Sequence, residues 1–292
     1  MVSPCAVFGS EVTPEMKFGI TMFPTDKSIG VIEMAKACEE RGFASLYFPE
    51  HTHIPASRAT PAPAGEPLAE EYYRSLDPFV ALGAVAAATT NLRFGTGIAL
   101  VAQRDPIVLA KEVASLDFVS GGRFVFGIGF GWNVEELADH GVAFKDRRAV
   151  VQERVEAMKA IWTQDEAAYA GEFVDFPPTF SWPKPVQTPH PPILIGGGGG
   201  PKLFEAIAAY ADGWIPIGGA GVNKNLPALH EAREKVGRDP AELTIVPFGV
   251  MPDPGKLAYY EESGFQEVVF RVPPAPEAKV LEILDRLATD FC

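Results

Sequence analysis

Residues 105–133 read DPIVLAKEVASLDFVSGGRFVFGIGFGWN, and this one stretch contains a helix start, a helix end and a strand. Asp105 offers a capping carboxylate, and Pro106 suits the first turn of a helix. Gly121-Gly122 ends the helix, and the apolar run 123–130 then predicts a strand. The helix residues predicted to pack on the core are Val108, Leu109, Val113, Leu116 and Val119.

The same unit recurs along the whole chain, and Asp77-Pro78 and Asp253-Pro254 mark two further helix starts. The predicted strands are residues 16–23, 45–49, 92–101, 123–130, 192–196, 213–217, 243–251 and 267–272. Because each strand is followed by a helical pattern, we expect an α/β fold, a (β/α)8 TIM barrel with its chemistry at the carboxyl ends of the strands.

Two segments interrupt this alternation. Thr52 to Ser75 is rich in proline and alanine, and Asp165 to Pro191 combines aromatic residues with prolines. We expect both to be insertion loops, the first after strand two and the second before strand five. The barrel is predicted to form a single domain over residues 16–292, and residues 1–15 are predicted to be an N-terminal extension.

The composition excludes several classes of function. The net charge of −13 disfavours nucleic acid and anionic membranes, because both bind positive surfaces. No run of 20 apolar residues occurs that could span a membrane. Cys5, Cys38 and Cys292 are too scattered for a disulfide framework or a zinc site. With no secretory signal at the start, we expect a cytoplasmic protein with a small-molecule partner.

Two imidazoles and a carboxylate follow the second predicted strand, in the run Glu50-His51-Thr52-His53. Histidine exchanges protons near neutral pH, and a neighbouring carboxylate can orient its ring. His51 and Glu50 are therefore the candidate catalytic residues. A polar loop at the barrel mouth explains the same run equally well, and no third ligand supports a metal site.

Glycines punctuate the third and fourth strands. In residues 94–98, Phe-Gly-Thr-Gly-Ile, they indicate either a bulge against which a flat ligand lies or simply tight packing of the barrel. Residues 127–131 form a lone Gly-x-Gly-x-Gly, and no ribose-binding acid follows at the expected offset, so we reject a Rossmann site. Asn133 then either caps the next segment or hydrogen-bonds a ligand.

The run Gly196 to Gly200 follows the fifth predicted strand and precedes a helical pattern. Such a loop exposes backbone N–H groups at a helix N-terminus, where the helix dipole favours an anion. We therefore favour a phosphate site here over a merely flexible turn. Lys202 is either an additional charge for that site or a solvated surface residue.

Taken together and in order, several short motifs resemble the luciferase-like monooxygenase superfamily, in particular its actinobacterial branch of oxidoreductases that depend on the deazaflavin coenzyme F420. The resemblance spans about residues 16–290. The motifs are Lys17-Phe18-Gly19-Ile20, Gly42-Phe43, Glu50-His51, Gly95-Thr96-Gly97-Ile98, Ser120-Gly121-Gly122-Arg123, Gly129-Phe130-Gly131-Trp132-Asn133, Gly196-Gly197 and Asp212-Gly213-Trp214.

This resemblance implies a homodimer and a cofactor site at the carboxyl ends of the strands. A cis peptide at Gly97-Ile98 would lie under the cofactor ring, and His51 would lie near it. The residues implied to border the pocket or hold the cofactor phosphate are Gly131, Trp132, Asn133, Gly197, Gly198, Gly199 and Gly200. Several members of the family carry aspartate where this chain has Glu50, so the role of Glu50 is not carried over.

Four functional hypotheses follow. The first is hydride transfer between F420 and a small organic substrate. The second is an FMN-dependent monooxygenase on the same fold, and the third is a flavin-binding protein without catalysis. The fourth is a barrel isomerase that uses only the phosphate site and has no affinity for flavin.

Overall fold

A computed structural model describes residues 16–63 and 65–292, so the predicted extension 1–15 lies outside the described residues. The strands of its main sheet are β1 (Lys17–Thr21), β2 (Ser45–Phe48), β3 (Arg93–Thr96), β4 (Phe124–Ile128), β7 (Ile193–Gly196), β8 (Gly213–Ile215), β9 (Thr244–Ile245), β10 (Phe248–Val250) and β11 (Glu267–Arg271). Each predicted strand is found, and the last-but-one is split into β9 and β10.

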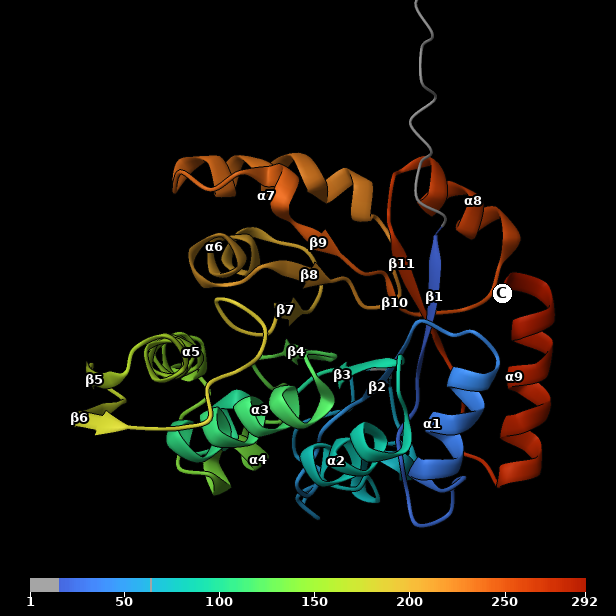
Figure 1. The fold of residues 1–292 in the computed structure, drawn as a ribbon, viewed down its shortest axis with the longest axis horizontal. Helices are drawn as coiled ribbons and strands as arrows, with labels where there is room; N and C mark the ends of the chain where they lie inside the picture. The colour runs from blue at the N-terminus through green and yellow to red at the C-terminus, as the bar shows by residue number, and fades with distance from the viewer. Residues whose placement is uncertain (1–15, 64) are drawn as a thin grey trace, which may run out of the picture.

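Helices follow the strands and surround the sheet, as Figure 1 shows. The α-helices are α1 (Val31–Glu40), α2 (Pro78–Ala88), α3 (Pro106–Ser120), α4 (Val134–Asp139), α5 (Arg147–Thr163), α6 (Pro201–Tyr210), α7 (Val222–Lys235), α8 (Pro254–Glu262) and α9 (Glu277–Phe291). Short 3-10 helices are η1 (Glu70–Tyr73), η2 (Val101–Gln103) and η3 (Pro240–Glu242). In the described residues, no helix has the length and apolar character needed to cross a membrane.

The sheet is parallel throughout and curls until its two ends meet. Its strand order is β10-β11-β1-β2-β3-β4-β7-β8-β9, so the first and last strands are consecutive pieces of residues 244–250. On one side of this segment the Val246 amide donates to the carbonyl of Trp214 at 3.0 Å. On the other side the Val269 amide donates to the carbonyl of Pro247 at 2.9 Å. The expectation of an α/β fold on a parallel sheet is confirmed.

A small apolar cluster lies between the strands of the curled sheet. It consists of Tyr47, Val125, Leu194, Ile215, Val246, Phe248 and Val269, with Ile98 packed against it. Within it the rings of Tyr47 and Phe248 meet edge to face, with centroids 5.4 Å apart. A larger apolar cluster includes buried residues of both the strands and the surrounding helices. The inner cluster separates the two ends of the strands.

The Asp-Pro signals are confirmed as helix starts. Asp77 and Asp105 each accept hydrogen bonds from two backbone amides of the first turn of α2 and α3, and Asp253 accepts one from the first turn of α8. In each helix the proline occupies an early position, where its missing N–H leaves no broken hydrogen bond.

The predicted apolar stripe of α3 is correct in its centre and wrong at its edge. Leu109, Val113 and Leu116 are buried, but Val108 is 56% exposed and Val119 is 66% exposed. At 3.6 residues per turn, Val108 and Val119 point about a quarter turn away from the buried face. They form part of an outer apolar surface instead.

The two segments that interrupt the alternation differ in structure. Residues 49–77 connect β2 to α2, and η1 is the one helix or strand among the described residues of this range. Before β7 lies an antiparallel hairpin of β5 (Glu166–Ala170) and β6 (Asp175–Phe180), which projects beyond α5 in Figure 1. The description of these segments as insertions into a family barrel stays a prediction.

Candidate active site

The polar residues singled out in the sequence follow the carboxyl ends of neighbouring strands. His51 follows β2, the Gly97–Ile98 peptide follows β3, Trp132 follows β4 and the glycine loop follows β7. Because β2, β3, β4 and β7 are consecutive neighbours in a parallel sheet, these segments lie along one rim of it.

His51 is held at both ring nitrogens. Its Nδ1 lies 3.0 and 3.1 Å from the two carboxylate oxygens of Glu136, and the indole N–H of Trp132 donates to its Nε2 at 3.3 Å. A neutral ring protonated at Nδ1 satisfies both contacts, since Nδ1 then donates and Nε2 accepts. The side chains of His51 and Glu136 are 6% and 1% exposed. This is a buried imidazole oriented by a carboxylate.

Glu136 is a site residue whose role sequence reasoning missed. It lies in the first turn of α4, where its amide donates to the side-chain oxygen of Asn133 at 3.0 Å. Asn133 is buried and acts as the N-cap of α4, which was one of its two predicted roles. An N-cap residue followed three positions later by glutamate is a known helix-start signal, and it could have drawn attention to Glu136.

An aromatic wall surrounds the imidazole. Tyr72, from η1 in the segment between β2 and α2, has its ring centroid 5.3 Å from that of His51. Trp132 has its centroid 5.7 Å from His51 and 6.3 Å from Tyr72. The proline-rich segment therefore contributes directly to the surroundings of His51.

Glu50 is buried and makes a different set of contacts from His51. One oxygen accepts from the backbone amide of Leu100 at 2.6 Å and the other from the Arg104 guanidinium at 2.6 Å. Arg104 also pairs with Asp77, the N-cap of α2. Burial by itself lowers the pKa of Arg104, but the charges of Glu50 and Asp77 outweigh it and raise that pKa. These contacts favour a positioning role for Glu50, and its predicted catalytic role stays a prediction.

A second group of polar side chains, contributed by the same two segments of the chain, follows His51 and Glu136 in sequence. Thr52 contacts His53 at 3.0 Å and His140 at 2.8 Å, and His53 Nε2 lies 3.0 Å from a carboxylate oxygen of Asp139. Burial, followed by the nearby charge of His53, lowers the pKa of His140. Within residues 16–63 and 65–292, no group of three His, Cys, Asp or Glu residues is arranged to hold a metal ion.

The peptide between Gly97 and Ile98 is cis, as the resemblance implied. Glycines make room around it. A Cβ at Gly97 would lie 2.3 Å from the ring of Phe248, and Cβ atoms at Gly129 and Gly196 would lie 2.2 and 2.8 Å from side-chain carbons of Ile98. Close packing beneath the rim therefore explains these three glycines, of which Gly97 directly follows β3, Gly129 directly follows β4 and Gly196 ends β7.

The glycine loop leads into α6 and leaves open space at its N-terminus. Gly200 is the N-cap of α6, with no side-chain cap, and a Cβ at Gly198 or Gly200 would touch nothing within 4 Å. Gly197 has φ of 148°, which L side chains rarely adopt, and its carbonyl accepts from the indole N–H of Trp214 at 2.9 Å. Gly199 packs against Asn225.

Arg148, on α5, reaches this loop. Its guanidinium stacks 4.2 Å from the ring centroid of Phe130 and donates to the carbonyl of Lys202 at 3.3 Å. The free amides at the start of α6 and this guanidinium together suit a phosphate. Gly131, where φ is +75° and a Cβ would contact Leu137, forms the turn between β4 and Trp132.

Comparison with known proteins identifies the family. The sequence model described as "Luciferase-like monooxygenase" matches residues 16–251. The chain belongs to the luciferase-like monooxygenase family. Its resemblance to this family is thereby confirmed.

Two curated proteins and one solved structure illustrate the range of this luciferase-like family. An uncharacterized protein of Mycobacterium tuberculosis is 44% identical over 94% of this chain and 98% of its own length. The F420-dependent glucose-6-phosphate dehydrogenase of Nakamurella multipartita is 30% identical, over 100% of this chain and 81% of its length. The crystal structure of monooxygenase RslO1 from Streptomyces bottropensis has a TM-score of 0.74 and 23% identity, covering 94% of this chain and 98% of that chain.

The luciferase-like family supports an enzyme of the oxidoreductase or monooxygenase class, and its α/β fold agrees with the curled sheet described above. Within the candidate site, the structure brings together His51 and Trp132 from the predicted residues, and adds Glu136 and Tyr72. Glu50 lies among other partners.

Proposed function

We propose that this chain is an F420-dependent oxidoreductase, which moves a hydride between the deazaflavin and a small organic substrate. The observation that carries the proposal is His51, a buried imidazole oriented by Glu136 on the same sheet rim as an open, phosphate-compatible glycine loop. The F420-dependent relative supports this choice of cofactor.

The described residues fit such a cofactor. Its phosphate would be held by the backbone amides of Gly198 to Gly200 and by Arg148, where the uncapped N-terminus of α6 offers donors. The amide of Gly197 instead donates to the carbonyl of Ile215 at 3.2 Å, so Gly197 would border the phosphate without donating to it. Its ring would lie against Gly97–Ile98, bordered by residues 131–133. When bound, F420 supplies the carbon that accepts or donates the hydride.

His51 would exchange the proton that leaves or joins the substrate when the hydride moves. The proton would pass at Nε2, which here accepts only a 3.3 Å bond from Trp132, while Nδ1 keeps its proton beside Glu136. The carboxylate then stabilises the imidazolium without itself being protonated. The aromatic wall of Tyr72 and Trp132 would exclude water from this step.

The first test is cofactor binding to the purified protein. F420 and FMN are titrated separately, with fluorescence and calorimetry as readouts. We expect F420 to bind clearly more tightly, and Arg148→Gln to weaken its binding by roughly 3- to 10-fold, since one charged hydrogen bond is lost. Arg286→Gln, an exposed arginine on α9, is the matched control. Failure to bind either cofactor would contradict the proposal.

An FMN-dependent monooxygenase is the second candidate. The same loop suits the phosphate of FMN, and the similar solved structure is a monooxygenase. Preference for FMN in the titration, together with oxygen consumption on reduction, would favour this function. A flavin-binding protein without catalysis would bind cofactor but show no turnover that depends on His51.

We also propose that the chain forms a homodimer through the outer face of α2 and α3. These helices lie side by side in Figure 1 and expose large apolar side chains. The exposed residues are Val80, Ile107, Val108, Phe118 and Val119. Large apolar side chains exposed on neighbouring helices are typical of association sites. Light scattering should give twice the chain mass of 31.4 kDa, and a mass near 31.4 kDa would contradict the dimer.

The cytoplasmic location stays a prediction.

A further inference from the structure

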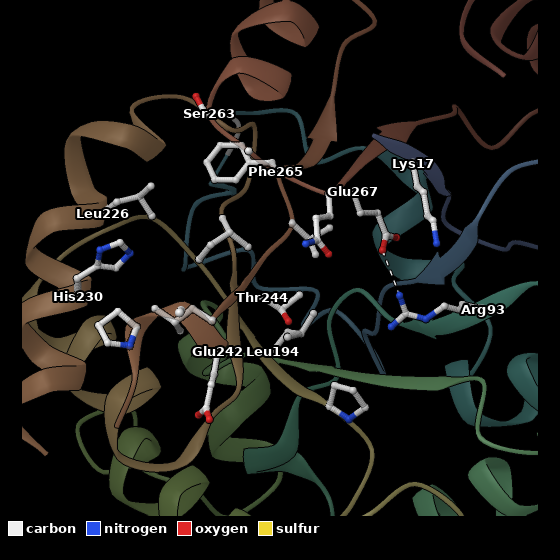
Figure 2. A pocket seen from close by; sticks show the side chains of 18 of the residues that line it. Lys17, Arg93, Leu194, Leu226, His230, Glu242, Thr244, Ser263, Phe265 and Glu267 are labelled. Atoms are coloured by element: carbon white, nitrogen blue, oxygen red, sulfur yellow. Dashed lines mark hydrogen bonds and ion pairs between the residues drawn. The ribbon is translucent and has the colours of Figure 1, made fainter. Parts of the chain in front are cut away.

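A cavity of about 540 Å³ opens at the other end of the sheet. The first residues of four strands line it: Lys17 of β1, Arg93 of β3, Thr244 of β9 and Glu267 of β11. Because the strands are parallel, their first residues share the amino-terminal edge, opposite the rim that carries His51. Figure 2 shows these side chains around the cavity.

A buried carboxylate faces this cavity. One oxygen of Glu267 accepts from the hydroxyl of Ser45 and lies 3.5 Å from the hydroxyl of Tyr47. Burial, followed by the negative charge of Glu267, raises the pKa of Tyr47 far above its usual value, so the phenol keeps its proton. A carboxylate that is buried in this way needs positive charge or hydrogen-bond donors nearby.

Arg93 provides the positive charge, but its contact with Glu267 occupies only part of the hydrogen-bonding capacity of its guanidinium. Its Nη1 lies 3.4 Å from the second oxygen of Glu267, which is long for a charge-assisted hydrogen bond. The Arg93 side chain is 46% exposed, and this is the single side-chain hydrogen bond it makes within residues 16–63 and 65–292. A guanidinium has five N–H donors, so most of them remain for a ligand. The dashed line in Figure 2 marks this pair.

The remaining wall of the cavity is mixed, because His230, Glu242 and Ser263 also line it, and its apolar part lies away from Arg93. Leu194 and Val246 belong to the inner cluster, and Leu226 and Phe265 lie across the cavity from Arg93 in Figure 2. The volume falls in the range of small-molecule pockets, and such pockets combine apolar walls with a few placed polar groups. Here an acceptor and a cationic donor lie side by side, and the apolar side chains of Leu226 and Phe265 lie across the cavity from them.

We propose that this cavity binds a free α-amino acid with an apolar side chain. Its ammonium group would bind Glu267, its carboxylate would bind Arg93, and its side chain would lie against Leu226 and Phe265. An α-amino acid carries its two charged groups on the same carbon, which matches a carboxylate and a guanidinium that lie close together. A ligand with only one of these charges would leave either Glu267 or Arg93 without its partner.

This site does not depend on the proposed function. The paired rings of Tyr47 and Phe248 lie between the cavity and Gly97, since Tyr47 lines the cavity and both residues contact Gly97. Amino-acid binding is therefore tested without cofactor, and loss of F420 binding would leave it untouched.

The test is calorimetric titration of the full chain with L-phenylalanine and L-leucine. Phenylacetate and 2-phenylethylamine, each with one of the two charges, are the comparison ligands. We expect saturable binding of the amino acids and at least tenfold weaker binding of both comparison ligands, since each loses one charged contact. Absence of binding by both amino acids, or equal binding of phenylacetate, would overturn the proposal.

Two variants locate the site. Arg93→Gln should weaken L-phenylalanine binding at least tenfold, whereas Arg286→Gln should not change it. The Arg93 side chain is partly exposed, so its variant is expected to fold, which a melting curve checks. Glu267→Gln should weaken L-phenylalanine and leave phenylacetate unchanged. If Arg93→Gln binds L-phenylalanine as the natural chain does, the assignment to this cavity is wrong.

Discussion

The two ends of the curled sheet each hold a buried carboxylate, but the partners differ. At the carboxyl end Glu136 faces His51, and at the amino end Glu267 faces Arg93. Histidine gains and loses a proton near neutral pH, whereas arginine stays charged. The first pair can therefore move a proton, and the second can only attract and orient charge. The chemistry of each end follows from the partner of the carboxylate.

The largest expected effect tests the proton-exchanging end. His51→Ala should lower kcat by at least about 100-fold, because general acid–base catalysis is lost, with the affinity for F420 nearly unchanged. The measurement is F420-linked turnover, followed by absorbance, on a panel of alcohols, aldehydes and ketones. Unchanged kcat would remove His51 from the mechanism. Binding of L-phenylalanine at the other end should not change.

The next effect concerns stability and compares two arginines. Arg104→Met should lower the free energy of unfolding by about 3 kcal/mol, because it leaves Glu50 buried without its charge partner. Arg93→Met should cost less than about 1 kcal/mol, because Arg93 is partly exposed and Glu267 keeps the hydroxyls of Ser45 and Tyr47 beside it. Urea unfolding of both variants measures the difference. Equal losses would show that burial does not distinguish the two pairs.

A smaller loss of rate is expected for the residue that orients the imidazole. Glu136→Gln should lower kcat by roughly 10-fold and leave KM almost unchanged, since the oriented imidazolium loses its stabilising charge. Glu135→Gln, its exposed neighbour on α4, is the control and should keep full kcat. A rise in KM at constant kcat would instead indicate a role in substrate binding.

The smallest expected effect is a pH dependence of the stability of the folded chain, caused by His140 beside the candidate site. Burial lowers the pKa of His140 in the folded state below its ordinary value of 6.5, so the folded chain resists protonation there. Its contribution to stability is complete above pH 6.5 and is lost as the pH falls through the lowered pKa. The melting temperature of His140→Gln relative to the natural chain should therefore rise on going from pH 7.5 to pH 5. A difference independent of pH would contradict this.

Local signals predicted the framework well. The strands and the Asp-Pro helix starts depend on short runs of sequence, and the structure contains each of them. The error at Val108 and Val119 arose because apolar character does not distinguish a helix face that packs on the sheet from a helix face that is exposed. Sequence pattern gives the period of a helix but not what covers each side.

The side chains that pair with the site residues could not be predicted in the same way. His51 and Glu136 are 85 positions apart, and Glu50 and Arg104 are 54 apart, so only the folded chain brings them together. Adjacency in sequence suggested that Glu50 orients His51, but the two side chains point to different partners. Tyr72 was hidden in a segment without regular periodicity.

The segment 244–250 also has a consequence for solubility. An open sheet exposes a row of unpaired backbone groups at each outer strand, and such edges recruit strands from other molecules into aggregates. In the main sheet of the described residues, both outer positions belong to this one segment, which is bonded to β8 on one side and β11 on the other. In the described residues, this sheet therefore offers no outer strand to which another copy of the chain could add a strand.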